Sequence, residues 1–142
     1  MVTRQFWLKK MRAALKERSI LWLRGARRTG KTRLIEQLPG VEIFDCELPR
    51  VRRQLEDPES FFGKHEAGSL VAFDEIHRLE NPSEVLKIAA DHFPEIRVVA
   101  TGSSTLAAGK KFSDTLTGRK HDLLLTPMNA LDNASFAVDS LE

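Results

Sequence analysis

Short runs of apolar residues alternate with amphipathic segments along the chain. Two runs, within Ser69–Asp74 and Ile96–Thr101, are nearly uninterrupted, which is typical of strands buried on both faces of a parallel sheet. Together with three shorter or alternating runs, they predict five strands: Ser19–Gly25, Val41–Cys46, Ser69–Asp74, Ile96–Thr101 and Lys120–Leu125. Helical signals lie between these strands, and this order favours an α/β domain with helices on both faces of the sheet.

The segments outside the strands carry helical periodicity or residues typical of helix ends. Before the first strand, apolar residues recur at spacings of three and four, which predicts an amphipathic helix with the stripe Trp7, Leu8, Met11, Ala14 and Leu15. Two helices begin with a capping residue and a first-turn proline, Asp57 with Pro58 and Asn81 with Pro82, and Glu84 is a capping-box partner for Asn81. Helices are therefore expected over Lys31–Leu38, Val51–Leu55, Asp57–Phe62, from Asn81 to near Pro94, and over Ser104–Gly118 with an interruption near Gly109.

The chain has 142 residues, of which 42% are apolar and 30% are charged. This size and balance predict a single globular domain over residues 1–142. No run approaches the roughly 18 consecutive apolar residues of a membrane-spanning helix, and Met1–Lys10 lacks the apolar core of a signal peptide. We therefore expect a cytoplasmic protein with no membrane partner. The one cysteine, Cys46, is interpreted as a small buried apolar residue.

The charge of the chain indicates whether nucleic acid is an expected partner. At +2 it is too small to argue for nucleic-acid binding. Basic residues do gather in two places, at Lys9, Lys10 and Arg12 and at Arg50, Arg52 and Arg53. Solvated helix faces explain such clusters, so nucleic acid stays an open alternative that rests on them alone.

The most specific spacing in the chain begins at Gly25. Eight residues follow G-x-x-x-x-G-K-T without a mismatch: Gly25, Ala26, Arg27, Arg28, Thr29, Gly30, Lys31 and Thr32. The two glycines let successive amide N–H groups point at phosphate oxygens, and the following helix directs its positive end at the same charge. Lys31 is expected to reach the β- and γ-phosphates, and the Thr32 hydroxyl to bind Mg²⁺. A strand before the loop and a helix after it are the context that this motif requires.

Two acids directly follow the buried run Leu70–Phe73. Asp74 and Glu75 are thereby placed at the carboxyl edge of the sheet, where ligands bind in open α/β folds. We expect Asp74 to hold Mg²⁺ and Glu75 to polarise the water that attacks the γ-phosphate. Alone, a strand that ends in two acids is an ordinary solvated strand end, and only the loop turns it into a predicted site. His77, beside these acids, is interpreted as a loop or surface residue.

Four segments together resemble a known family: GARRTGKT, DEIHRL, VVATGSS and TLTGR. They are similar to the N-terminal ATPase domain of prokaryotic AAA-type proteins that carry a C-terminal domain of unknown function. The resemblance extends roughly from Leu8 to Met128. GARRTGKT and DEIHRL are common to the whole P-loop class, whereas ATGSS together with LTGR narrows the resemblance to this one family. The resemblance implies a three-layer P-loop sandwich with strand order 5-1-4-3-2, with ATP and Mg²⁺ as ligands and ATP hydrolysis as the activity.

The resemblance also implies roles for residues near the end of the chain. Thr101 or Ser103 would be the sensor that hydrogen-bonds the γ-phosphate or the attacking water. The alternative role of either residue is to cap the helix that follows the strand, because serine and threonine are both favoured at that position. Arg119 would reach the nucleotide of a neighbouring subunit, which implies a homo-oligomer, and its alternative is an ordinary surface arginine.

The chain departs from the family pattern after the fifth strand, because the helical lid and the C-terminal domain do not follow. We therefore expect a truncated protein whose affinity and turnover depend on the absent parts. A nucleotide-dependent switch that binds ATP with little turnover is the main alternative to an ATPase. A small-molecule kinase is less favoured, because a full strand-helix unit, Val41–Phe62, separates the loop from the acids. A DNA-binding regulator rests only on the basic clusters.

Overall fold

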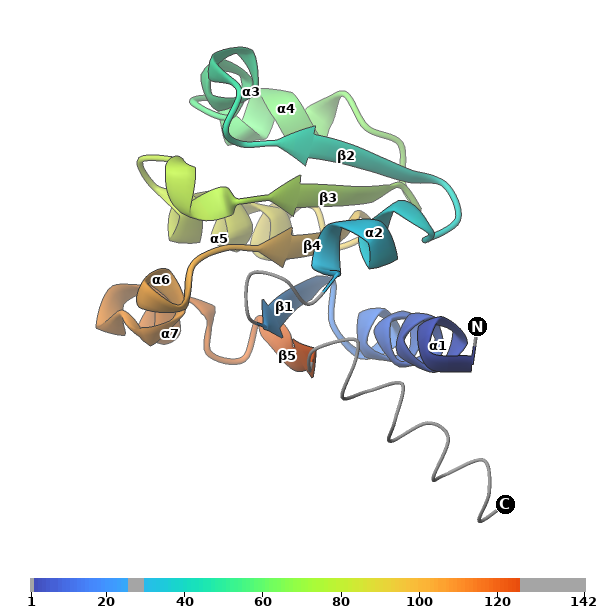
Figure 1. Ribbon diagram of the computed structural model, residues 1–142. Helices are drawn as coiled ribbons and strands as arrows, with labels where there is room; N and C mark the ends of the chain where they lie inside the picture. Colours follow the sequence, from blue (N-terminus) through green and yellow to red (C-terminus); the bar gives the residue numbers. More distant parts are fainter. Residues whose placement is uncertain (1, 26–29, 126–142) are drawn as a thin grey trace.

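The computed structural model describes residues 2–25 and 30–125. Its centre is a sheet of five parallel strands in the order β2-β3-β4-β1-β5, which Figure 1 shows side by side. This is the expected order 5-1-4-3-2 taken from the other edge. The strands are β1 (Ile20–Gly25), β2 (Val41–Asp45), β3 (Leu70–Asp74), β4 (Arg97–Thr101) and β5 (Lys120–Leu125). All five expected strands are confirmed, with ends shifted by at most one residue.

The strand order decides which residues meet at the carboxyl edge of the sheet. Phe73 of β3 is paired with Ala100 of β4, so that the next residues, Asp74 and Thr101, lie beside each other. On the other side of β4, β1 ends at Gly25. Because all strands are parallel, these three strand ends share one edge of the sheet, and the loops that follow them face the same solvent space.

Helices cover both faces of the sheet (Figure 1). On one face, α1 (Val2–Glu17) and α2 (Lys31–Glu36) pack their apolar residues against β1, β3, β4 and β5. On the other face lie α3 (Pro49–Gln54), α4 (Pro58–Gly63), α5 (Pro82–His92) and α7 (Lys110–Leu116). Two short elements, η1 (Ile76–Arg78) and α6 (Ser104–Ala108), follow β3 and β4 at the carboxyl edge. The three-layer α/β architecture expected from the sequence is confirmed.

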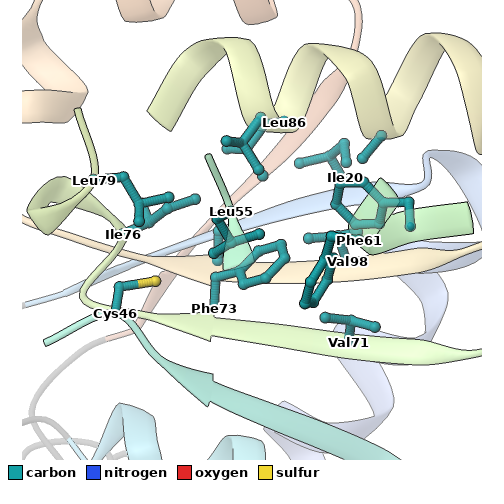
Figure 2. Packing of buried hydrophobic residues seen from close by; sticks show 14 of the residues in the cluster. Ile20, Cys46, Leu55, Phe61, Val71, Phe73, Ile76, Leu79, Leu86 and Val98 are labelled. Carbon is teal, nitrogen blue, oxygen red and sulfur yellow. The ribbon is translucent and has the colours of Figure 1, made fainter. Parts of the chain in front are cut away.

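The larger core lies between the sheet and α5. Phe73 of β3, Ile76 of η1 and Leu86 of α5 are fully buried there, and Figure 2 shows Cys46 at one end of the same cluster. Burial of each such large apolar side chain stabilises the fold by about 1.5–3 kcal/mol. The carboxyl end of β3 and the turn after it are therefore anchored by packing, although they face the solvent-exposed edge of the sheet.

Helix starts lie within one residue of those expected, except that α3 begins at Pro49 and not at Val51, because proline suits the first turn of a helix. One predicted cap also differs. The Asp57 carboxylate accepts the backbone N–H of Ser60 at 3.1 Å and caps α4, as predicted. Asn81 is the N-cap residue of α5, but its side chain makes no capping hydrogen bond, so the predicted capping role of that side chain is wrong. The following Pro82 explains why the helix begins there without it, because proline has no N–H to satisfy and its φ is already helical. The expected interruption at Gly109 is confirmed, since α6 ends and α7 begins there.

Within residues 2–25 and 30–125, no helix combines the length and the apolar character that crossing a membrane requires.

Candidate functional site

A cleft of about 770 Å³ opens at the carboxyl edge of the sheet. This volume is in the range of small-molecule binding sites. Its walls come from five places in the sequence, namely the end of β1 with the start of α2, Glu47 after β2, the turn after β3, the segment after β4 and the end of β5. The lining residues that matter below are Gly25, Gly30, Lys31, Thr32, Asp74, Glu75, His77, Gly102, Ser103 and Leu124. Seven of the predicted site residues are thereby brought together.

The predicted phosphate-binding loop frames one side of this cleft. Gly30 has φ 85° and ψ 22°, a left-handed conformation that favours glycine, and it directly precedes α2. Lys31 Nζ donates to the carbonyl oxygen of Gly25 at 3.1 Å, so the cation lies across the mouth of the loop. The predicted loop residues Ala26, Arg27, Arg28 and Thr29 lie outside the described residues. Gly25 and Gly30, the described ends of the loop, both line the cleft, and the phosphate-binding role of the loop stays a prediction.

Four polar residues form a connected hydrogen-bond network next to the loop, here called the Asp74 network. The Thr32 hydroxyl donates to Asp74 Oδ2 at 3.2 Å, and the Thr101 hydroxyl donates to Asp74 Oδ1 at 2.7 Å. The backbone N–H of Glu75 donates to Thr101 Oγ1 at 3.1 Å. The start of α2, the end of β3 and the end of β4 are thereby connected by one carboxylate. Asp74 and Thr32 present only oxygen atoms, which are the ligands that Mg²⁺ prefers.

Glu75 has an unusual backbone. Its φ is 59° and its ψ is 47°, and within residues 2–25 and 30–125 it is the only residue other than glycine with a positive φ. A left-handed conformation costs a residue with a Cβ roughly 1–2 kcal/mol, and such strain concentrates at functional sites. The Thr101 hydroxyl holds the N–H of Glu75 in this conformation, and the side chain of Glu75 lines the cleft.

Of the two residues predicted as a sensor, only Ser103 lines the cleft. Its Oγ accepts the N–H of Leu106 at 3.2 Å and caps α6, which is the alternative role that the sequence allowed. Thr101 has no exposed surface, and its hydroxyl is directed at Asp74 and Glu75. The Thr101 side chain is therefore not placed to contact a ligand directly, because its hydroxyl is buried and already hydrogen-bonded within the protein.

The glycine between these two residues is required by packing. An added Cβ at Gly102 would lie 2.8 Å from Cη2 of Trp22 and 3.3 Å from a methyl carbon of Ile76. The turn after β4 therefore runs directly over the indole ring of Trp22, which itself lines the cleft. The sequence pattern alone did not indicate this contact.

Arg119 lies outside the cleft. Its guanidinium donates two hydrogen bonds to the Asp91 carboxylate, at 2.8 and 3.0 Å, and a third to the carbonyl oxygen of Thr115 at 2.6 Å. The hydrogen bond from Arg119 holds the pKa of Asp91 below its usual range, and the same bond raises the pKa of Arg119. Within one chain, Arg119 therefore connects the end of α5 to the turn before β5. Its predicted role toward a neighbouring subunit stays a prediction.

Residues that the sequence analysis did not assign to the site also line the cleft, among them His77 and Leu124. His77, interpreted there as a loop or surface residue, lines the cleft and contacts both Glu75 and the turn after β4. Leu124 of β5 lines the cleft with more than half of its surface exposed. The position of His77 two residues after Glu75 was visible in the sequence, but only the 3₁₀ turn of η1 directs its ring back toward the cleft.

Cys46 takes no part in the cleft. Its side chain is fully buried, and burial, helped by the nearby charges of Asp45 and Asp74, raises the pKa of the thiol to about 12. The thiol is therefore protonated at neutral pH and is not a nucleophile. The structural role predicted for Cys46 is confirmed.

The chain is also similar to known proteins. Residues 17–132 match the model of a family described as an AAA domain. No curated protein matches the chain. Among solved structures, a Walker-type ATPase of Pyrococcus abyssi is similar with a TM-score of 0.61 and 18% identity, over 87% of this chain and 53% of that chain. Drosophila ORC bound to DNA has a TM-score of 0.57 and 12% identity, over 89% and 93% of the two chains.

A variant of RuvB from Thermotoga maritima gives a TM-score of 0.57 and 20% identity, over 83% of this chain and 43% of that chain. At such identities the likeness concerns the fold alone. This chain spans about half the length of the Pyrococcus and Thermotoga chains.

Proposed function

Because the chain belongs to the AAA domain family, we propose that it binds ATP with Mg²⁺ in the cleft and hydrolyses it to ADP and phosphate. The observation that carries the proposal is the Asp74 network beside Lys31. A flexible cation (Lys31) and a hydroxyl (Thr32) from the start of α2 line one cleft with two acids from the end of β3. Phosphoryl transfer to water needs these groups in combination.

The triphosphate is proposed to lie along the loop from Gly25 to Thr32. Backbone N–H groups of this loop, including those of Ala26, Arg27, Arg28 and Thr29, would donate to phosphate oxygens. Lys31 Nζ, which now donates to a carbonyl oxygen 3.1 Å away, would exchange that partner for the β- and γ-phosphates. A charge-assisted hydrogen bond to phosphate is stronger than one to a neutral carbonyl, and this difference favours the exchange.

Thr32 and Asp74 fit a magnesium site. Both are oxygen donors, and their oxygens already lie 3.2 Å apart. Mg²⁺ in nucleotide sites is usually held by one or two protein side chains together with phosphate oxygens. The described residues contain no cluster of three or more His, Cys, Asp or Glu side chains that would suit a fully protein-bound metal. When bound, Mg²⁺ would supply neutralisation of the charge on the phosphates.

Glu75 is proposed to orient the attacking water and to accept its proton. The water oxygen forms a bond to the γ-phosphorus while the bond from that phosphorus to the bridging oxygen breaks, and the electron pair leaves with ADP. Ser103 lines the same cleft and retains a hydroxyl proton that can be donated to a γ-phosphate oxygen. Thr101 is assigned an indirect part, since it holds Asp74 and the backbone of Glu75.

Arg119 is proposed to act only in an oligomer. To reach a neighbouring nucleotide it must leave Asp91, to which it is bound by two hydrogen bonds. An arginine supplied in this way is typically worth about 10³ to 10⁵ in rate. A homo-oligomer is part of this proposal. The likeness to ORC bound to DNA concerns the fold, and a nucleic-acid partner for this chain is not supported by the cleft.

Calorimetry with ATP and Mg²⁺, combined with a phosphate-release assay, tests the proposal. Lys31→Ala should abolish tight ATP binding, whereas Glu75→Gln should bind ATP like the parent and release little phosphate, because an amide cannot accept the proton. Lys64→Ala and Glu95→Gln are matched controls, since both residues are exposed and precede strands at the opposite edge of the sheet.

Unchanged ATP affinity in Lys31→Ala would refute the site. If the parent protein binds ATP but releases no phosphate, the alternative is favoured, namely a nucleotide-dependent switch with little turnover. In that case the cleft assignment stands and the hydrolytic role of Glu75 fails.

A further inference from the structure

His77 connects two parts of the cleft that the chain brings together from distant positions. Its Nδ1 accepts the backbone N–H of Ser103 at 3.1 Å, and its Nε2 lies 3.5 Å from Glu75 Oε2. We propose that His77 is a positioning residue, which orients the carboxylate of Glu75 and couples it to the turn after β4. This inference rests on the hydrolytic role proposed for Glu75.

The hydrogen bond from Ser103 selects one form of the imidazole ring. A backbone N–H can only donate, so Nδ1 must be an unprotonated acceptor. The ring proton of the neutral imidazole then lies on Nε2, which is the nitrogen that faces Glu75. The ring therefore presents a donor to the carboxylate and not a lone pair. The separation of 3.5 Å is longer than a well-formed hydrogen bond, as is common for catalytic groups before substrate binds.

Glu75 needs such a partner. Its side chain is 37% exposed, and in the part of the chain that the structure describes His77 is the ionisable residue in contact with its carboxylate. The backbone is held at the other end, where the N–H of Glu75 donates to Thr101. A carboxylate that must align one water gains from a fixed rotamer, because misplacement by about 1 Å can cost about a hundredfold in rate. Thr101 and His77 together restrain both ends of the residue.

The same ring gives the turn after β4 a connection to Glu75. Ser103 donates its N–H to His77 and uses its Oγ to cap α6, so a shift of this turn moves the ring. Space for alternative positions is small, because Gly102 already lies against Trp22. Contact of a γ-phosphate with Ser103 would thus be transmitted to Glu75 through one imidazole.

Two substitutions separate the two contacts of the ring. In His77→Asn, the side-chain carbonyl oxygen takes the place of Nδ1 and keeps the acceptor for Ser103, while the donor to Glu75 is lost. In His77→Gln, the terminal amide nitrogen reaches the place of Nε2 and keeps the donor. His92→Asn is the matched control, because His92 is exposed at the end of α5 and outside the cleft.

His77→Asn should lower kcat about tenfold, as loss of an orienting partner typically does, while ATP affinity and melting temperature remain close to those of the parent. His77→Gln should recover most of this loss. Equal kcat values for the two variants would overturn the proposal, as would a loss of turnover that only follows a loss of ATP affinity or of melting temperature.

A second measurement does not depend on turnover. The ring ¹⁵N shifts of His77, assigned by comparison with His77→Gln, should report a neutral ring with the proton on Nε2, and Glu75→Ala should shift the Nε2 resonance. A proton on Nδ1, or an Nε2 resonance that ignores Glu75→Ala, would refute the inference even if Glu75→Gln behaves as proposed. Conversely, parent-like hydrolysis by Glu75→Gln would refute the role of Glu75 while the ring measurement could still show the contact.

Discussion

Replacement of Thr101 by valine tests whether its hydroxyl stabilises the fold or acts only on bound nucleotide. Valine preserves the shape of the side chain but removes the hydroxyl, which has no exposed surface. Two bonds disappear: the donor bond to Asp74 Oδ1 at 2.7 Å and the acceptor for the N–H of Glu75 at 3.1 Å. A hydrogen bond to a charged group contributes about 1.5–3 kcal/mol and a neutral one about 1 kcal/mol, and a methyl in place of the buried hydroxyl offsets part of this sum.

We therefore expect Thr101→Val to lower the free energy of unfolding by about 2–3 kcal/mol. Urea unfolding should detect this as a midpoint lower by roughly 1–2 M, since the slope for a small domain is about 1–3 kcal/mol per M. Thr101→Ser is the control. It keeps the hydroxyl and loses one buried methyl group, which should cost about 1 kcal/mol.

The two interpretations of Thr101 predict opposite results. A sensor that touches only the nucleotide would leave the stability of the free protein unchanged in Thr101→Val and reduce hydrolysis alone. The Asp74 network predicts the reverse order of effects, with stability lost before any ligand is added and Mg²⁺-dependent ATP binding weakened afterwards. Equal unfolding midpoints for the valine variant and the parent would refute the network as a source of stability.

Two further predictions concern ionisable groups outside the cleft. Because the pKa of Cys46 is raised from 9.0 to about 12 in the folded chain, unfolding releases its proton above pH 9, and stability should fall by about 1.4 kcal/mol per pH unit from there toward pH 12. Urea unfolding of the parent and of Cys46→Ala between pH 8 and 10 isolates this slope. If the free energy of unfolding of the two proteins depends on pH in the same way, the raised pKa is contradicted. The chain has no tyrosine, whose titration would overlap this range. For Asp91, the pKa is lowered by the hydrogen bond from Arg119, so the pair should stabilise the fold above the usual aspartate pKa and lose its effect as pH falls through the lowered value. Asp91→Asn should therefore lower the melting temperature at pH 7, and its difference from the parent should shrink as the pH falls below the usual aspartate range. Arg119→Ala also loses the hydrogen bond to the carbonyl oxygen of Thr115, so part of its effect should remain in acid. A difference between Asp91→Asn and the parent that does not change with pH would show that the loss is not electrostatic.

The elements of this fold were predictable because their signals are local. The runs Leu70–Phe73 and Val98–Ala100 are apolar throughout, and β3 and β4 begin within one residue of them. Gly30 is needed for its positive φ, and the motif spacing expresses that need in the sequence itself. The strand order could not be obtained from such local signals, and it followed from the family resemblance.

The contacts inside the site were not predictable in the same way. Thr101 and Asp74 are 27 positions apart, and His77 and Ser103 are 26 positions apart. Each pair meets only because β3 and β4 are neighbours in the sheet. Sequence spacing cannot tell a threonine that faces a ligand from one that is turned inward, because both end a strand and precede a turn. Asp91 and Arg119 illustrate the same limit, since their pairing depends on how α5 and α7 pack.

The position of β4 explains why the site depends on a buried hydroxyl. β4 separates β1, which leads into the loop, from β3, which ends in the acids, so the loop and the acids cannot share a backbone contact. Thr32 bridges this gap on the solvent side by its bond to Asp74, and Thr101 supports the same carboxylate from within the sheet. If β3 were next to β1, the strand ends would pair directly and a threonine at position 101 would have no carboxylate to hold. The order of the strands thus creates the need that Thr101 meets, and it places Ser103 where His77 can reach it.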